Sequence, residues 1–183
     1  MGKRRIALAW MLCLGLLCAS GWAGAAPEGS EYRVDDLGMV IAAPEDWVVD
    51  DDQTLQRINV MQMDDKLTHP TLLMSQAKQD VDGLLRIELS MERTKAFSSA
   101  IVYAAALLVD SDQMFMQLGE KPRYEALTWP ELDWPGISIQ SGETVWIYWV
   151  AQTEDGFYTL QISYPCAHPE YGEQIRGLIR MER

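Results

Sequence analysis

Apolar and polar residues alternate along several short stretches of the chain, which is the pattern of β-strands with one buried face. Residues 55–63 and 84–91 alternate most clearly, and residues 37–43, 48–49 and 71–77 are further strand candidates. The pattern predicts that the N-terminal half of the chain consists mainly of strands.

Three more strands are predicted near the C-terminus, at residues 137–140, 144–152 and 157–164. Asp155-Gly156 separates the last two, and Asp-Gly is a strong signal for a β-hairpin. The middle strand is apolar on both faces, which predicts a central strand that is covered on both sides. These faces consist of Trp146, Tyr148 and Val150, and of Ile147 and Trp149.

Apolar residues recur at helical spacing in two places. Residues 95–109 predict a helix that packs on a sheet. A closing helix is predicted from Pro169, because proline suits the first helical position. Its apolar face would consist of Tyr171, Ile175, Leu178 and Ile179.

The region between these helices is harder to assign. Residues 114–118 are a further strand candidate, and residues 119–136 contain three prolines and predict the longest irregular stretch of the chain. Trp129-Pro130 and Trp134-Pro135 lie within it. Two tryptophans beside prolines would form a rigid apolar surface of the kind found in binding hot spots. The alternative is that both indoles are packed into the core.

The first residues have the order of a secretory signal peptide, which is basic, then apolar, then small. Lys3, Arg4 and Arg5 precede an apolar run at residues 6–19, and Ala23 and Ala25 give a cleavage site. The run has about 14 residues, fewer than the roughly 20 that span a bilayer. An uncleaved anchor is therefore disfavoured, and so is a lipoprotein, since Cys13 and Cys18 each follow a leucine.

We therefore expect residues 1–25 to be removed, residues 26–31 to form a flexible leader, and residues 32–183 to form a single domain. The mature protein would have no membrane span and would act in the periplasm or outside the cell.

The charge and the cysteine content of the chain exclude several kinds of binding partner and site. The chain has 15 basic and 27 acidic residues, and loss of residues 1–25 would leave 12 basic residues and a net charge of −15. Such an acidic domain is not expected to bind nucleic acid or anionic lipid. Cys166 alone would remain of three cysteines, so no internal disulfide and no cysteine-based zinc cluster is expected.

Cys166-Ala167-His168 places a thiol and an imidazole two residues apart. A nucleophile pair needs contact between these groups and a third group that orients the imidazole, and the spacing alone defines no such family. We favour a structural role in a strand-to-helix connection. A metal site from Cys166, His168, Glu170 and His69 would fall short of the four Cys or His ligands of structural zinc. No metal and no cofactor is therefore expected.

Residues 37–47, LGMVIAAPEDW, resemble the opening motif of the PsbP-like superfamily, a glycine and alternating apolar residues followed by P-x-x-W. The hairpin at residues 146–164 and the closing amphipathic helix are also similar. The resemblance implies an α+β fold in which helices flank both faces of an antiparallel sheet, an α-β-α sandwich. It supplies no catalytic residues, because that superfamily has none in common.

These features favour a non-enzymatic binding or accessory protein of the bacterial envelope that contacts another protein, with Trp129 and Trp134 as the candidate contact residues. Two alternatives stay open. One is a small hydrolase or redox protein that uses Cys166 and His168, and the other is a carrier with a small-ligand pocket between sheet and helix. The sequence leaves the oligomeric state open.

Overall fold

The structure is a computed structural model and describes residues 30–52, 54–55, 69–76, 85–129 and 131–182. The expected signal peptide lies outside these residues, and so do residues 56–63 of the strand expected at residues 55–63. Leu55, the first residue of that strand candidate, is buried and donates its N–H to the carbonyl oxygen of Asp51.

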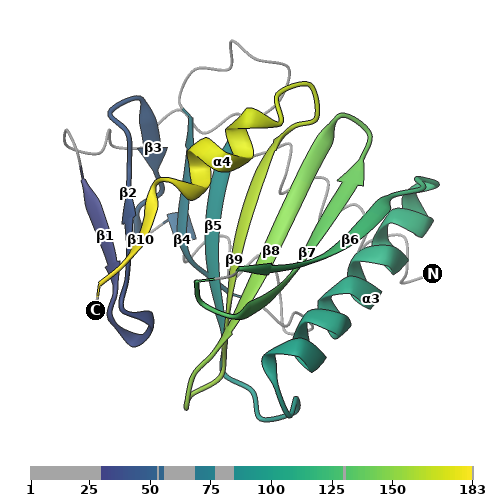
Figure 1. Cartoon of the computed structure of the whole chain (residues 1–183), viewed down its shortest axis with the longest axis horizontal. Helices are drawn as coiled ribbons and strands as arrows, with labels where there is room; N and C mark the ends of the chain where they lie inside the picture. The colour runs from purple at the N-terminus through teal and green to yellow at the C-terminus, as the bar shows by residue number, and fades with distance from the viewer. Residues whose placement is uncertain (1–29, 53, 56–68, 77–84, 130, 183) are drawn as a thin grey trace.

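A large sheet forms the centre of the molecule (Figure 1). Its strands are β3 (Trp47–Val49), β4 (His69–Gln76), β5 (Arg86–Glu92), β6 (Arg123–Trp129), β7 (Trp134–Ser141), β8 (Thr144–Gln152) and β9 (Phe157–Pro165). The order across the sheet is β3-β4-β5-β9-β8-β7-β6, and neighbouring strands are antiparallel. β8 lies between β9 and β7, which confirms the prediction of an interior strand.

The other elements are a small sheet and two helices. The small sheet is built from β1 (Glu31–Val34), β2 (Met39–Ala42) and β10 (Ile179–Met181), with η1, the 3-10 helix Asp35–Leu37, between β1 and β2. The helices are α3 (Ala100–Leu118) and α4 (Glu170–Arg176). Figure 1 shows the small sheet and α3 on opposite sides of the view, and α3 contacts β7 and β8 of the large sheet. Within the described ranges no helix is long and apolar enough to cross a membrane.

Successive residues of the central strands belong to different core clusters, because side chains of a strand point alternately to opposite faces. In β8, Trp149 belongs to a first cluster and Val150 to a second. The first cluster joins the large sheet to the small sheet through Ile41 and to α4 through Ile175. The second joins β7, β8 and β9 to α3 through Tyr103, Ala104, Phe115, Ile137, Ile139, Val150 and Phe157. The α+β class is confirmed, whereas helices on both faces of the sheet stay a prediction.

The connection between β8 and β9 contains the predicted Asp155-Gly156 pair. Gly156 has φ 154°, and a Cβ on it would collide with the carbonyl oxygen of Glu92 at the end of β5. Only glycine fits here, because it lacks the Cβ and tolerates this backbone conformation.

The first helix starts later and ends later than predicted. Ser99 caps it by accepting the Val102 N–H at 3.4 Å, and Gly119 ends it in the left-handed conformation. The strand predicted at residues 114–118 is wrong, because Phe115 lies on the buried face of α3. A short apolar segment fits a strand and the end of a helix equally well.

Two further predictions are wrong for reasons of long-range pairing. Most of residues 119–136 is the β6–β7 hairpin, in which Pro135 pairs with Thr128 near the turn. The sheet tolerates proline there because Pro135 is near the start of β7 and precedes Gly136, the first residue of β7 that pairs with β8. The closing helix ends at Arg176, and Ile179 instead pairs with Ile41 of β2.

A hydrogen bond links the two sheets. The Tyr158 hydroxyl of β9 donates to Oδ2 of Asp36 in η1 at 2.7 Å. Burial, together with the hydrogen bond and charge of Asp36, raises the pKa of Tyr158 to about 12.

This shift predicts a loss of stability at alkaline pH. An unfolded tyrosine loses its proton near pH 10, so from about pH 10 to about pH 12 the unfolded chain is deprotonated while folded Tyr158 keeps its proton. The free energy of unfolding should be at its full value below this window and fall across it.

The Tyr158→Phe variant should show a smaller fall, measured by urea denaturation at about pH 9 and about pH 11.5. The other buried tyrosines contribute equally to both proteins and cancel in the comparison. Equal falls in the two proteins would contradict this account.

Candidate functional site

The two tryptophans predicted as contact residues form a cross-strand pair. Trp129 ends β6 and Trp134 begins β7, and their rings pack edge to face with centroids 6.0 Å apart. The Trp129 ring also lies 4.8 Å from that of Trp149 in β8. Trp129 is only 7% exposed and belongs to the first core cluster, whereas Trp134 is half-buried against that cluster. Of the two, Trp134 has the accessible surface.

Trp129→Ala should therefore act on stability. Removing a buried indole is expected to lower the free energy of unfolding by about 3–5 kcal/mol. Trp134→Ala, at the half-buried position, should cost clearly less. Urea denaturation of both variants checks this, and equal losses would show that Trp129 is no more a core residue than its partner.

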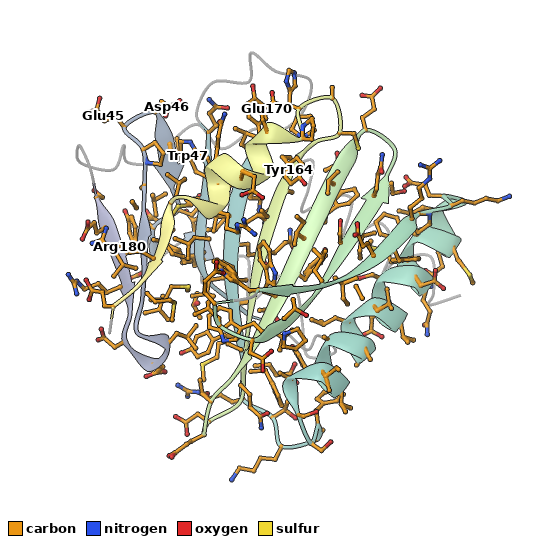
Figure 2. All side chains as sticks on the ribbon, in the orientation of Figure 1. Glu45, Asp46, Trp47, Tyr164, Glu170 and Arg180 are labelled. Atoms are coloured by element: carbon orange, nitrogen blue, oxygen red, sulfur yellow. The ribbon has the colours of Figure 1, made fainter. Side chains whose placement is uncertain are left out.

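Cys166 and His168 contact different partners. The Cys166 sulfur lies 3.9 Å from the carbonyl oxygen of Gly142. Nδ1 of His168 lies 3.0 Å from Oε1 of Glu170, at the start of α4 (Figure 2), and its ring stacks on Tyr171 with centroids 4.9 Å apart. The Glu170 pKa is lowered by a hydrogen bond from its own backbone N–H and by the bond to His168.

No hydrogen bond joins Cys166 to His168 among the described residues. His69 begins β4, and its side chain lies outside what the structure describes. In the described part of the chain no three His, Cys, Asp or Glu side chains gather as metal ligands do.

A polar cluster that sequence reasoning missed lies on β5. Nη2 of Arg86 lies 2.5 Å from Oε2 of Glu88, and the Ser90 hydroxyl donates to Oε1 of Glu88 at 3.0 Å. The Arg86 and Glu88 side chains are only 14% and 15% exposed. The sequence signal for this cluster is the alternation of Arg86 and Glu88 with Ile87 and Leu89. This alternation predicts a strand, and because β5 is paired on both of its edges, the two charges lie on an interior strand.

The sheet register extends this cluster across three strands. Arg86, Glu88 and Ser90 pair with Ser163, Gln161 and Thr159 of β9 in that order. Gln161 in turn pairs with Tyr148 of β8. Burial raises the pKa of Tyr148, and the Glu88 charge adds to the rise, so its hydroxyl stays protonated as a donor.

The cluster predicts an asymmetric response to mutation. Glu88→Leu leaves the Arg86 charge buried without its partner and should cost about 3 kcal/mol of unfolding free energy. The double variant Arg86→Leu/Glu88→Leu should cost less than half of this, because apolar side chains replace both charges. Glu173→Leu is the control, since its ion pair with Arg176 is exposed and worth about 0–1 kcal/mol. A double variant less stable than Glu88→Leu would contradict this account.

The exposed large apolar side chains of the described residues gather on α3 and β6. Ile101, Val109 and Met116 are 68%, 54% and 63% exposed and lie along one side of α3, with Val102 beside them. We call these four residues the α3 stripe. Tyr124 of β6 is the fifth member of the exposed set.

A hydrogen bond ties β6 to α3. The Tyr124 hydroxyl donates to Oδ1 of Asp112 at 2.8 Å. Burial, and then Asp112 through its hydrogen bond and charge, raise the Tyr124 pKa to about 12. The α3 stripe and the edge strand β6 therefore adjoin one another.

One shallow pocket lies beside the β8–β9 turn. Its volume is about 170 Å³, and its walls include Lys95, Phe97, Glu154 and Phe157. Pockets that hold small molecules usually measure about 300–1,000 Å³. This pocket therefore gives the carrier hypothesis little support.

The elements and the strand order make this an α+β domain. The solution structure of cyanobacterial PsbP (CyanoP) from Synechocystis sp. PCC 6803 is similar to this chain with a TM-score of 0.54. The match covers 90% of this chain and 99% of that one at 8% sequence identity, so it shows the fold alone. It confirms the PsbP-like fold that the LGMVIAAPEDW motif implies, whereas helices on both faces of the sheet stay a prediction. No family model and no curated protein sequence matches the chain.

Proposed function

We propose that this chain is an exported, non-enzymatic accessory protein that binds another protein of the bacterial envelope. The basic, apolar and small segments of residues 1–25 support export to the periplasm or the cell exterior. The PsbP-like fold is consistent with an accessory role. The separate bonding of Cys166 and His168 gives a hydrolase or redox role no support from geometry.

The observation that carries the proposal is the α3 stripe. Burying one apolar side chain of this size contributes about 1.5–3 kcal/mol. Ile101, Val109 and Met116 together can therefore supply a substantial part of a binding free energy. A cluster of apolar side chains on a rigid helix is a common form of protein-binding surface.

Charges around the stripe define the chemistry of the partner. Asp112 lies three residues after Val109 and four before Met116 on α3, and the exposed Glu120 follows the end of the helix. A partner with an apolar groove and a rim of Lys or Arg complements this surface. The same acidic residues disfavour an anionic lipid surface as the binding target.

The contact role of Trp129 and Trp134 stays a prediction. Trp134 is the member of the pair that a partner can reach without unfolding the hairpin. It offers a smaller surface than the stripe, which is the reason to place the main contact on α3.

The double variant Val109→Ser/Met116→Ser tests the proposal. It should weaken the complex with the envelope partner by at least about tenfold, because two apolar anchors are lost. The free energy of unfolding should change by less than about 0.5 kcal/mol at each exposed site. The partner is captured by cross-linking in native cells that make the full-length chain, and Kd is then measured with the purified partner.

Gln152→Ser/Gln174→Ser is the control, since both glutamines are exposed and lie outside α3, on β8 and α4. The mass of this chain, measured in the cross-linked complex, checks export, because the exported chain should lack residues 1–25. Unchanged partner binding in the Val109/Met116 variant would refute the stripe as the contact. Retention on neutral phospholipid vesicles without a protein partner would refute the proposed function.

A further inference from the structure

The outer edge of β6 is available for pairing. β6 is the last strand of the large sheet and pairs with β7 on one edge only, among the strands that the structure describes. Its residues 123–126 are all exposed. An edge of this kind presents backbone N–H and C=O groups to which another strand can add.

The sequence of this edge is complementary to itself. Arg123 and Glu125 lie on one face of β6, on either side of Tyr124, because alternate residues share a face. On β7 they pair with Gln140 and Ser138, which carry no charge. If two β6 strands run antiparallel with their centre at Tyr124, Arg123 of each lies opposite Glu125 of the other.

We infer that a second copy of this chain pairs with β6, antiparallel and centred on Tyr124, so that the two large sheets continue into one. Two Arg123–Glu125 ion pairs would then form across the interface, with the two Tyr124 residues opposite one another between them. Cross-strand pairs of opposite charge and of aromatic residues are both favourable.

A second copy fits this edge better than an arbitrary strand does. Charged residues on an edge usually prevent pairing, since like charges meet when two such edges approach. Here the two charges differ in sign and stand two residues apart, so self-pairing brings opposite charges together. The edge has seven residues, whereas a standard stable interface buries roughly 1,200–2,000 Å². We therefore expect a weak dimer with a Kd in the range of roughly 1–100 μM.

This dimer goes beyond the proposed function. Because Tyr124 bonds to Asp112 of α3, each copy would bring its own α3 close to the shared interface. A partner of the envelope would then meet two α3 stripes on one assembly, which raises its apparent affinity if both can be engaged.

A charge-exchange experiment tests the inference. Sedimentation equilibrium of the mature protein, from about 1 μM to about 1 mM, should show a reversible monomer–dimer equilibrium. Arg123→Glu and Glu125→Arg should each weaken the dimer by at least about tenfold, since like charges then face each other twice. The double variant Arg123→Glu/Glu125→Arg should restore the wild-type Kd, because it exchanges the two charges without changing the net charge.

Lys95→Glu and Glu154→Arg are the matched controls, since they change the net charge by the same amounts at exposed positions in the connections before α3 and between β8 and β9. Neither should change the Kd by as much as the β6 variants do. A protein that is monomeric throughout the range, or a double variant that stays as weak as the single ones, would overturn the inference. The Val109→Ser/Met116→Ser variant should still dimerise, so failure of the dimer and failure of the partner contact are separate outcomes.

Discussion

The burial of β9 on both of its faces is the constraint on which the rest of the molecule depends. β9 lies in the middle of the large sheet, and eight of its nine residues are buried. Tyr158, Leu160, Ile162 and Tyr164 form an apolar row on one face. That row needs an apolar cover, and the small sheet and α4 supply it. Gly172 makes the close approach of α4 possible, because a Cβ there would lie 2.9 Å from the Tyr164 ring.

The other face of β9 combines an apolar residue with buried polar groups. Phe157 lies under α3, where it stacks on Tyr103 with centroids 4.7 Å apart. Further along, this face carries hydroxyl and amide groups and meets Arg86 and Glu88 of β5. Buried polar groups are tolerated only when they are paired. The Arg86–Glu88–Ser90 cluster meets that requirement for both oxygens of the Glu88 carboxylate, whereas Nε of Arg86 is buried without a hydrogen-bond partner.

Local signals explain which parts of the fold could be predicted from the sequence. β8, β9 and the Asp155-Gly156 turn were predictable because alternation and turn chemistry act between near neighbours. Ile179 was placed in a helix because its spacing from Ile175 suits one, while its strand partner Ile41 lies far away in the chain. The sequence predicts an irregular stretch at the β6–β7 hairpin because prolines disfavour strands. The hairpin depends instead on cross-strand pairing, which places Trp129 against Trp134. The Arg86–Glu88 pair was visible as alternation, but its burial follows from the sheet order, which no local pattern contains.

The surface of the molecule carries the groups that bear on a function specific to this chain. At 8% identity the likeness to CyanoP preserves a pattern of buried strands and helices rather than particular side chains. A shared fold at this identity does not by itself imply a shared activity. The groups that folding leaves unused are the candidates for a function specific to this chain. Among the described residues these groups are concentrated on the outward side of α3 and the free edge of β6. Apolar side chains left in water and a strand edge left unpaired are both stabilised by association with protein, which is the physical basis of the proposed binding role.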